Sequence, residues 1–214
     1  MHFEAHAGLG WALGVLAPGS DRRLRAWVTL AAVLPDIDAA AYFWGDVAYT
    51  NYHHTFGHNV FLGALVAGAA AAHHPRRILA GAVTALSFGL HLVTDMKLSA
   101  YPVALFWPRS DRWYEFTPNL GLASPINTWL VYAGIALAVV LAFVKKVSPL
   151  DLVSPRLDRI VLGFFRAKTL TCKCGRRCNE VCDGCAAPVC LRCGHVSLRF
   201  LVHCPDCSAA AAGR

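Results

Sequence analysis

The sequence predicts an all-α integral membrane domain of about four to five hydrophobic helices, followed by a small cysteine-rich domain stabilised by zinc. Hydrophobic residues make up 56% of the 214 residues and charged residues only 15%, which is too apolar for an ordinary soluble domain. Two apolar runs of 19 residues, 78–96 and 126–144, are each long enough to cross a bilayer. All nine cysteines lie after residue 171. We therefore divide the chain into a membrane domain (1–147), an amphipathic linker helix (148–170) and a zinc-binding domain (171–208).

The N-terminal residues combine short apolar segments with polar groups that suit a metal ion. Residues 1–20 hold a short apolar segment that cannot span a bilayer alone, and His6 lies at its start. The motif Leu-Pro-Asp-Ile-Asp at 34–38 then interrupts the next apolar stretch, because its proline breaks or kinks a helix beside two carboxylates, Asp36 and Asp38. A carboxylate pair in such a turn is either a hard-cation site or a helix cap in a loop.

Three histidines follow within six residues, at His53, His54 and His58. Gly57 loosens the backbone just before a helix that we expect from Asn59 to Ala72. So dense a group of imidazoles indicates a metal-binding or catalytic segment rather than a structural one.

The first long apolar run ends with a histidine and an aspartate four residues apart, His91 and Asp95. Residues at i and i+4 lie on one face of a helix, so this pair supplies half of a divalent-metal site. The alternative is a polar helix end with a buried, structurally satisfied histidine. Ionisable residues within a membrane segment are costly, and that favours a functional role.

The remaining membrane domain is a long connection and a second apolar helix. Residues 98–125 form a loop of nearly thirty residues, which at this length suggests a lid or a substrate wall. Basic turns at 21–25, 75–77 and 145–146 predict the cytoplasmic side of a multi-pass protein of the cell membrane. The candidate ligands would then face the opposite side, and the cysteine-rich tail would lie in the cytoplasm. Residues 154–168 predict an amphipathic helix, either on an anionic membrane surface or as a simple linker.

The order of these motifs resembles a family of membrane-bound metal-dependent hydrolases, also described as LexA-binding, inner-membrane-associated hydrolases. The resemblance covers residues 1 to about 145 and rests on His6, the motif at 34–38, the segment 53–58, the His91–Asp95 pair and the Trp107-Pro108 dipeptide. The chain departs from the family pattern at His54, Gly57 and Asn59, where the family has Arg, Thr and Ser. The resemblance implies an all-helical membrane domain with hydrolase activity, and it implies no particular substrate.

The residues themselves suggest how such an enzyme would work. Imidazole and carboxylate ligands suit Zn²⁺, Mn²⁺ or Fe²⁺. His6, Asp38, His58, His91 and Asp95 offer enough ligands for one ion, and Asp36 and His53 could extend the site to two. If it is not a ligand, Asp36 or His53 would be the general base for a metal-activated water. A site at a membrane face predicts a lipid-like ester or phosphoester as the substrate.

The cysteine-rich tail predicts two structural zinc sites, because three Cys-x-x-Cys pairs and an upstream cluster lie close together. A cross-braced scheme joins 182/185 with 204/207, and 190/193 with two of the upstream three; sequential pairing is the alternative. The tail resembles treble-clef or B-box-like zinc modules. Its nine candidate ligands are Cys172, Cys174, Cys178, Cys182, Cys185, Cys190, Cys193, Cys204 and Cys207.

The net charge of +7 is a weak sign of nucleic-acid binding. Two zinc ions with four thiolates each would lower it to about +3. Membrane lipid and a protein partner for the zinc module are therefore the expected contacts. The main prediction is a metal-dependent membrane hydrolase. The alternative is a non-enzymatic membrane adaptor whose zinc module binds a protein, and a metal transporter or sensor is the least favoured reading.

Overall fold

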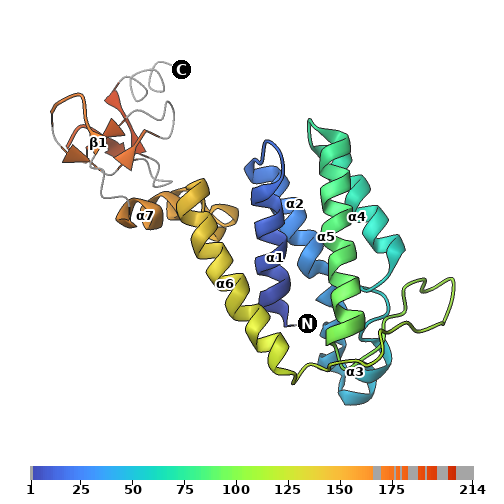
Figure 1. Cartoon of the computed structure of the whole chain (residues 1–214). Helices are drawn as coiled ribbons and strands as arrows, with labels where there is room; N and C mark the ends of the chain where they lie inside the picture. Colours follow the sequence, from blue (N-terminus) through green and yellow to red (C-terminus); the bar gives the residue numbers. More distant parts are fainter. Residues whose placement is uncertain are drawn as a thin grey trace. The chain divides into compact units, whose positions relative to one another are not determined.

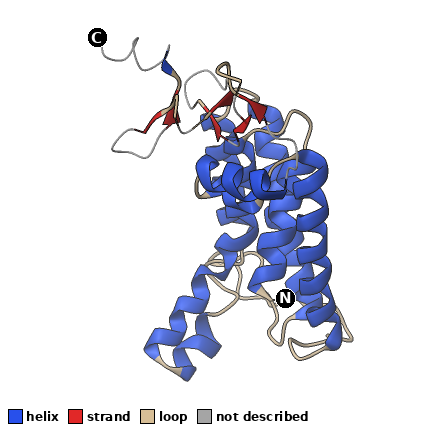
Figure 2. Ribbon diagram, turned by 90° about the vertical axis from the view of Figure 1, so that its left-hand side faces the viewer, coloured by secondary structure: helices blue, strands red, loops and turns tan. Residues whose placement is uncertain are grey.

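A computed structural model describes residues 2–165, 170–175, 177–178, 180–182, 188–190, 192–196 and 202–205. Contacts between residues divide the chain into two compact units, Met1–Lys145 and Lys146–Arg214. The first unit contains most of the helices, and the short strands among the described residues all belong to the second (Figures 1 and 2).

The first unit is built from helices joined by loops (Figure 1). An isolated bridge between Val103 and Tyr114 fastens the long loop before the last helix. In chain order the helices are α1 (Phe3–Leu16), α2 (Arg22–Val33), the 3₁₀ segment η1 (Leu34–Trp44), α3 (Asp46–Tyr52), α4 (Val60–His73), α5 (Arg77–Leu98) and α6 (Pro125–Lys145).

Three helical segments are long and apolar enough to cross a membrane: Arg22–Trp44, Arg77–Leu98 and Pro125–Lys145. The last two coincide with the predicted apolar runs to within two residues. The helices α1 and α4 have 14 residues each and are shorter than a full span. Four to five hydrophobic helices were expected, and three reach the length of a span.

The expected break at Pro35 is a change of helix type. Pro35 lies at the start of η1, so α2 continues directly into a 3₁₀ segment. A proline is tolerated in the first turn of a helix because its missing N–H group has no partner to lose there. The tighter winding turns Asp36 and Asp38 to different neighbours, as described below.

Side-chain caps fix the starts of two helices. The Asp21 carboxylate accepts a hydrogen bond from the Leu24 N–H at 2.8 Å, as its sequence position predicts. The Asn59 side chain accepts one from the Leu62 N–H at 2.9 Å and starts α4 one residue later than expected.

Small residues let the helices of this unit approach closely. A Cβ atom on Gly10 of α1 would lie 2.3 Å from the Ala32 Cβ of α2, so only glycine fits. The buried core is shared by α2, α4, α5 and the loop after α5, and its members are Ala31, Val66, Phe88, Leu92, Met96 and Val103. This packing holds the ends of α2 and α5 together, and these ends carry the candidate ligands.

The helix directions separate two kinds of residue. The basic turns at 22–25 and 76–77 and the end of α6 lie at one end of the unit (Figure 1). The start of α1, the η1 segment and the end of α5 lie at the other end. The candidate ligands of the membrane domain therefore gather opposite the basic turns.

The second unit begins with η2 (Pro149–Leu152) and α7 (Pro155–Phe165), where a longer amphipathic helix was expected. The Asp158 carboxylate accepts a hydrogen bond from the Ser148 N–H at 2.6 Å and ties α7 to the segment before it. Three antiparallel pairs of two-residue strands follow: β1 (Leu170–Thr171) with β2 (Arg177–Cys178), β3 (Glu180–Val181) with β4 (Pro188–Val189), and β5 (His195–Val196) with β6 (Val202–His203).

Candidate metal centre

Asp95 lies at the centre of a buried group of imidazoles near the end of α5. Its side chain is about 2% exposed. One carboxylate oxygen, Oδ1, lies 3.0 Å from the Nε2 atom of His6. The other, Oδ2, lies 3.3 Å from His58 Nε2, 3.4 Å from His54 Nε2 and 3.5 Å from His91 Nε2. Side chains from α1, from the loop before α4 and from α5 thus converge on one carboxylate.

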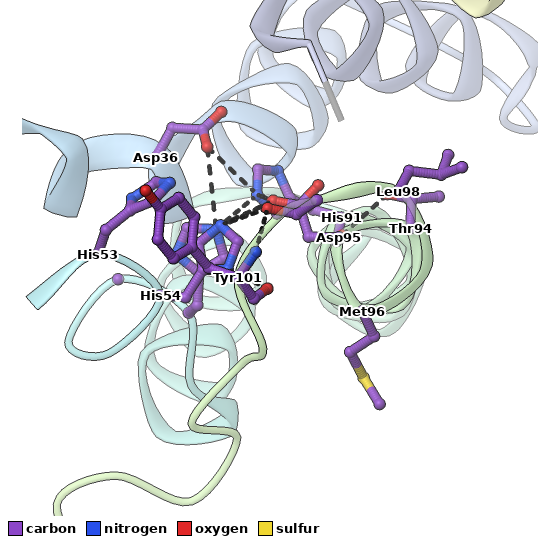
Figure 3. Close-up of polar contacts among 12 residues, drawn as sticks. Asp36, His53, His54, His91, Thr94, Asp95, Met96, Leu98 and Tyr101 are labelled. Atoms are coloured by element: carbon purple, nitrogen blue, oxygen red, sulfur yellow. Dashed lines mark hydrogen bonds and ion pairs between the residues drawn. The ribbon is translucent and has the colours of Figure 1, made fainter. Parts of the chain in front are cut away.

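Asp36 approaches the same point from η1. Its Oδ1 atom lies 3.8 Å from His58 Nε2 and 3.7 Å from His91 Nε2. Ligand atoms of Asp36, His58, His91 and Asp95 all lie within 4.8 Å of one another, close enough to hold a metal ion. Figure 3 shows Asp36, His54, His91 and Asp95 pointing toward each other and Met96 pointing away. The buried Asp36 Oδ2 has no hydrogen-bond partner among the described residues.

The hydrogen bonds of three imidazoles indicate which ring nitrogens carry a lone pair. The Nδ1 atom of His91 donates to the Ala32 carbonyl at 2.6 Å, and that of His54 donates to the Tyr101 carbonyl at 3.0 Å. His58 Nδ1 donates to the Asp38 carboxylate at 2.8 Å. Because Nδ1 is the donor in each ring, Nε2 carries the lone pair when the imidazole is neutral. This arrangement is typical of histidines that bind metals through Nε2.

These lone pairs face one another. His58 Nε2 and His91 Nε2 are only 3.0 Å apart, with carboxylate oxygens of Asp36 and Asp95 nearby. Electron-rich atoms at such distances repel unless a proton or a cation lies between them. Burial lowers the pKa of His58, but its bonds with Asp38 and Asp95 outweigh this and raise its pKa to about 9. The cluster therefore favours positive charge, and its donor atoms fit a divalent cation.

Asp38 has a different environment from Asp36. Its Oδ1 accepts from His53 Nδ1 at 2.9 Å. Its Oδ2 accepts a hydrogen bond from His58 Nδ1. The same oxygen accepts hydrogen bonds from the Thr55 N–H at 3.1 Å and the Gly57 N–H at 3.2 Å. All of these bonds hold the segment 53–58, so Asp38 orients two imidazoles from behind the cluster.

The segment 53–58 needs an unusual backbone. A Cβ atom on Gly57 would lie 2.0 Å from the Pro35 carbonyl oxygen, which only a glycine avoids. His54 has a φ of 66°, a left-handed conformation that is rare for residues other than glycine. Burial lowers the pKa of His54, which keeps the ring neutral. Backbone conformations of this kind are often found at functional sites.

A cleft of about 510 Å³ opens beside the cluster. One wall is polar and is formed by Asp36, His53, His54, Asp95 and Tyr101 (Figure 3). Another part of the lining, the apolar wall, includes Phe3, Leu30, Val33, Leu34, Ile37 and Leu122. A concave apolar site with a few convergent polar groups is the usual form of a small-molecule site.

The second unit contains a group of four thiols. Sulfur atoms of Cys172, Cys174, Cys190 and Cys193 all lie within 4.8 Å of one another, so this group could bind a metal such as zinc. It joins the pair 190/193 to two of the three upstream cysteines, one of the arrangements that the sequence left open. The Cys182 sulfur accepts a hydrogen bond from the Cys204 N–H at 3.2 Å. Cys185, Cys207 and the side chain of Cys178 lie outside the described residues.

Most of the expected membrane-domain residues come together. His6, His58, His91 and Asp95 meet at one point, with Asp36 beside them and the Asp38–His53 pair behind. Sequence reasoning left His54 without a role, although its ring is buried and directed at Asp95. The dense group of histidines at 53–58 was the available signal, but only the Tyr101 carbonyl reveals which nitrogen of His54 points inward.

Comparison with known proteins gives one match. The family model described as YdjM inner membrane protein matches residues 1–157. The search of curated proteins finds no match, and neither does the search of solved structures.

Proposed function

Because the chain belongs to the YdjM inner membrane protein family, whose model covers residues 1–157, we propose that it is a membrane-bound, metal-dependent hydrolase. The family and the three long apolar helices establish that the protein is a membrane protein. The hydrolase activity is the step beyond them, and it rests on the His/Asp cluster and the cleft beside it.

One observation supports this proposal above the others. The Nε2 atoms of three imidazoles, His54, His58 and His91, converge on Asp95, and the neighbouring Asp36 keeps a buried oxygen without a partner among the described residues. We assign these five residues as the ligands, with His6 holding Asp95 through its other oxygen. Relative to the sequence-based prediction, Asp36 takes the place of Asp38 as a ligand, and Asp38 and His6 become residues that position the ligands. Imidazole and carboxylate donors suit Zn²⁺, Mn²⁺ or Fe²⁺.

The cation would supply Lewis-acid chemistry, acidifying a water molecule and polarising the ester. His53 is the general base in this mechanism. It lines the cleft, and its Nδ1 atom forms a hydrogen bond with Asp38. Its Nε2 atom is therefore the nitrogen that can accept a proton from a water molecule. His53 takes a proton from a water molecule while the oxygen of that water forms a bond to the carbonyl carbon or the phosphorus of the ester. The ester C–O or P–O bond then breaks, and His53 returns the proton to the leaving oxygen.

The positions of the basic residues support a membrane orientation. The basic turns and the end of α6 lie together, opposite the cluster, and lysines and arginines favour the cytoplasmic side. In this orientation the protein is multi-pass, the cleft faces the outer side, and the cysteine-rich tail is cytoplasmic. There its thiols stay reduced and available for two zinc ions and for contact with a protein partner.

Metal content per chain tests the proposal. We compare the purified protein with a His91→Ala/Asp95→Ala double variant by elemental analysis, followed by a screen of ester and phosphoester substrates. The expected result is one or more ions above those of the tail in wild type, their loss in the variant, and hydrolysis by wild type alone. Equal metal content in both proteins, or hydrolysis that survives in the variant, contradicts the proposal and favours the adaptor reading.

A further inference from the structure

The two unlike walls of the cleft indicate how a substrate would lie in it. The polar wall carries the cluster, and among the described residues no Lys or Arg lines the cleft. The apolar wall comes mainly from the end of α2 and the start of η1, through Leu30, Val33, Leu34 and Ile37. A site with one polar and one apolar side suits an amphiphile that has its polar group at the cluster.

The apolar wall belongs to a membrane-spanning segment. Leu30 and Ile37 lie within Arg22–Trp44, which is long and apolar enough to cross a bilayer, and they are 43% and 51% exposed. Exposed apolar side chains of a spanning helix contact the acyl chains of lipids. The apolar side of the cleft is therefore continuous with the hydrocarbon of the membrane.

The depth of the cluster matches the level of the ester bonds in a lipid leaflet. Asp95 follows Arg77 by 18 residues in α5, which is about 27 Å at a rise of 1.5 Å per residue. The hydrocarbon core of a bilayer is about 30 Å thick. If the basic turn at Arg77 marks one boundary of the core, Asp95 lies close to the other, where the acyl chains meet the polar headgroups.

From these observations we propose that the substrate is a lipid ester that enters the cleft sideways from the leaflet. Its acyl chain lies against Leu30, Val33 and Ile37, and its ester group lies at the polar wall beside Asp36, His53 and Tyr101. The hydrolysis of this lipid rests on the proposed function. The binding site for the lipid does not depend on that reaction and can be tested without it.

A photoreactive lipid tests the binding site directly. The full-length protein is reconstituted in vesicles of phosphatidylcholine and phosphatidylglycerol with an ether-linked phosphatidylcholine that carries a diazirine next to the glycerol. This probe has no ester to hydrolyse. After illumination, labelled residues are identified by mass spectrometry. We expect labelling at the polar wall, at Tyr101 or Asp36, which lipids surrounding the helices do not reach unless they enter the cleft.

Two substitutions fill the apolar wall, Leu30→Trp and Val33→Trp. The matched control is Leu86→Trp, at a similarly exposed apolar position on α5 outside the cleft. The two wall variants should reduce labelling of the polar wall about tenfold. This is the loss expected if the indole ring displaces about two methylene groups of the lipid acyl chain from the apolar wall. The control should keep wild-type labelling. Two wall positions are used in case one variant fails to fold, which its zinc content and elution volume would reveal.

The outcomes separate this inference from the proposed function. No labelling of the polar wall in wild type, or equal labelling in the folded wall variants, overturns the lipid site, even if short soluble esters are hydrolysed. Labelling that the wall variants abolish, in a protein that hydrolyses no ester, supports the lipid site and contradicts the proposed hydrolase.

Discussion

The His/Asp cluster of the first unit and the thiol cluster of the second differ in what brings their ligands together. Buried apolar side chains of α2, α4 and α5 pack around the His/Asp cluster and position it. The thiols of the second unit are held by strands of two residues each, with a buried core that includes the cysteines themselves. We therefore expect the first site to form without a metal and the second unit to need one for its fold.

The two clusters also differ in their access to substrate. The thiol group consists of four ligands, the closed set that is typical of a structural zinc site. The His/Asp cluster borders a cleft through Asp36, His54 and Asp95, as expected of a site that exchanges ligands. One chain therefore combines a His/Asp cluster that borders a cleft with a compact group of four thiols.

Chelation of metal should give the largest difference between the two units. Zinc contributes about 10–16 kcal/mol to the folding of small zinc domains, so a strong chelator should unfold the second unit. The helices of the first unit should persist, because apolar packing holds them. Limited proteolysis with mass spectrometry will show this as rapid cleavage after residue 165 and protection of residues 2–145. Equal sensitivity of both units would contradict the comparison.

The His54→Gln variant tests a ligand of the accessible centre. Mn²⁺ suits imidazole and carboxylate better than thiolate, so it reports on this centre while zinc remains in the tail. Loss of a direct ligand should weaken Mn²⁺ binding by more than about 100-fold. Replacing a residue that only orients a ligand usually weakens metal binding by less than this. Pulsed electron paramagnetic resonance should show one imidazole nitrogen fewer. The control is His73→Gln, because His73 is exposed and lies at the other end of α4. Unchanged nitrogen couplings would exclude His54 as a ligand.

The Asp38→Asn variant separates orientation from ligation. Asp38 holds His53 and His58 by their Nδ1 atoms, so its loss should weaken Mn²⁺ binding about 10–100-fold without removing a ligand. The same spectra should keep the wild-type number of nitrogen couplings. An Asp111→Asn variant in the exposed loop is the control. A loss of Mn²⁺ binding well beyond about 100-fold would instead make Asp38 a direct ligand.

The Asp21→Ala variant should have the smallest effect and leave both centres intact. It removes the cap of α2, whose loss costs about 1 kcal/mol of stability. Thermal unfolding followed by circular dichroism will measure the change, and metal content should stay at the wild-type value. A loss of metal on this substitution would show that the two ends of the first unit are not independent.

Local sequence signals predicted the helices and part of the candidate site. The apolar runs located α5 and α6, and the His91–Asp95 spacing placed both side chains on one face. The role of Asp38 depends on bonds from the distant Thr55 and Gly57 amides, which no local pattern encodes. The orientation of His54 likewise depends on the carbonyl of Tyr101, 47 residues away. The expected four to five hydrophobic helices are not confirmed as spans: among the described residues three helical segments are long enough, because α1 and α4 are short.

The dual role of Asp38 limits how this site can change during evolution. One carboxylate aligns His58, which points at Asp95, and His53, which lines the cleft. In the mechanism that we propose, a single replacement of Asp38 would disturb metal affinity and proton transfer together, so neither property can be adjusted alone at this position. Descendants of this protein would have to vary their chemistry elsewhere, and the walls of the cleft are the part of the site free to do so.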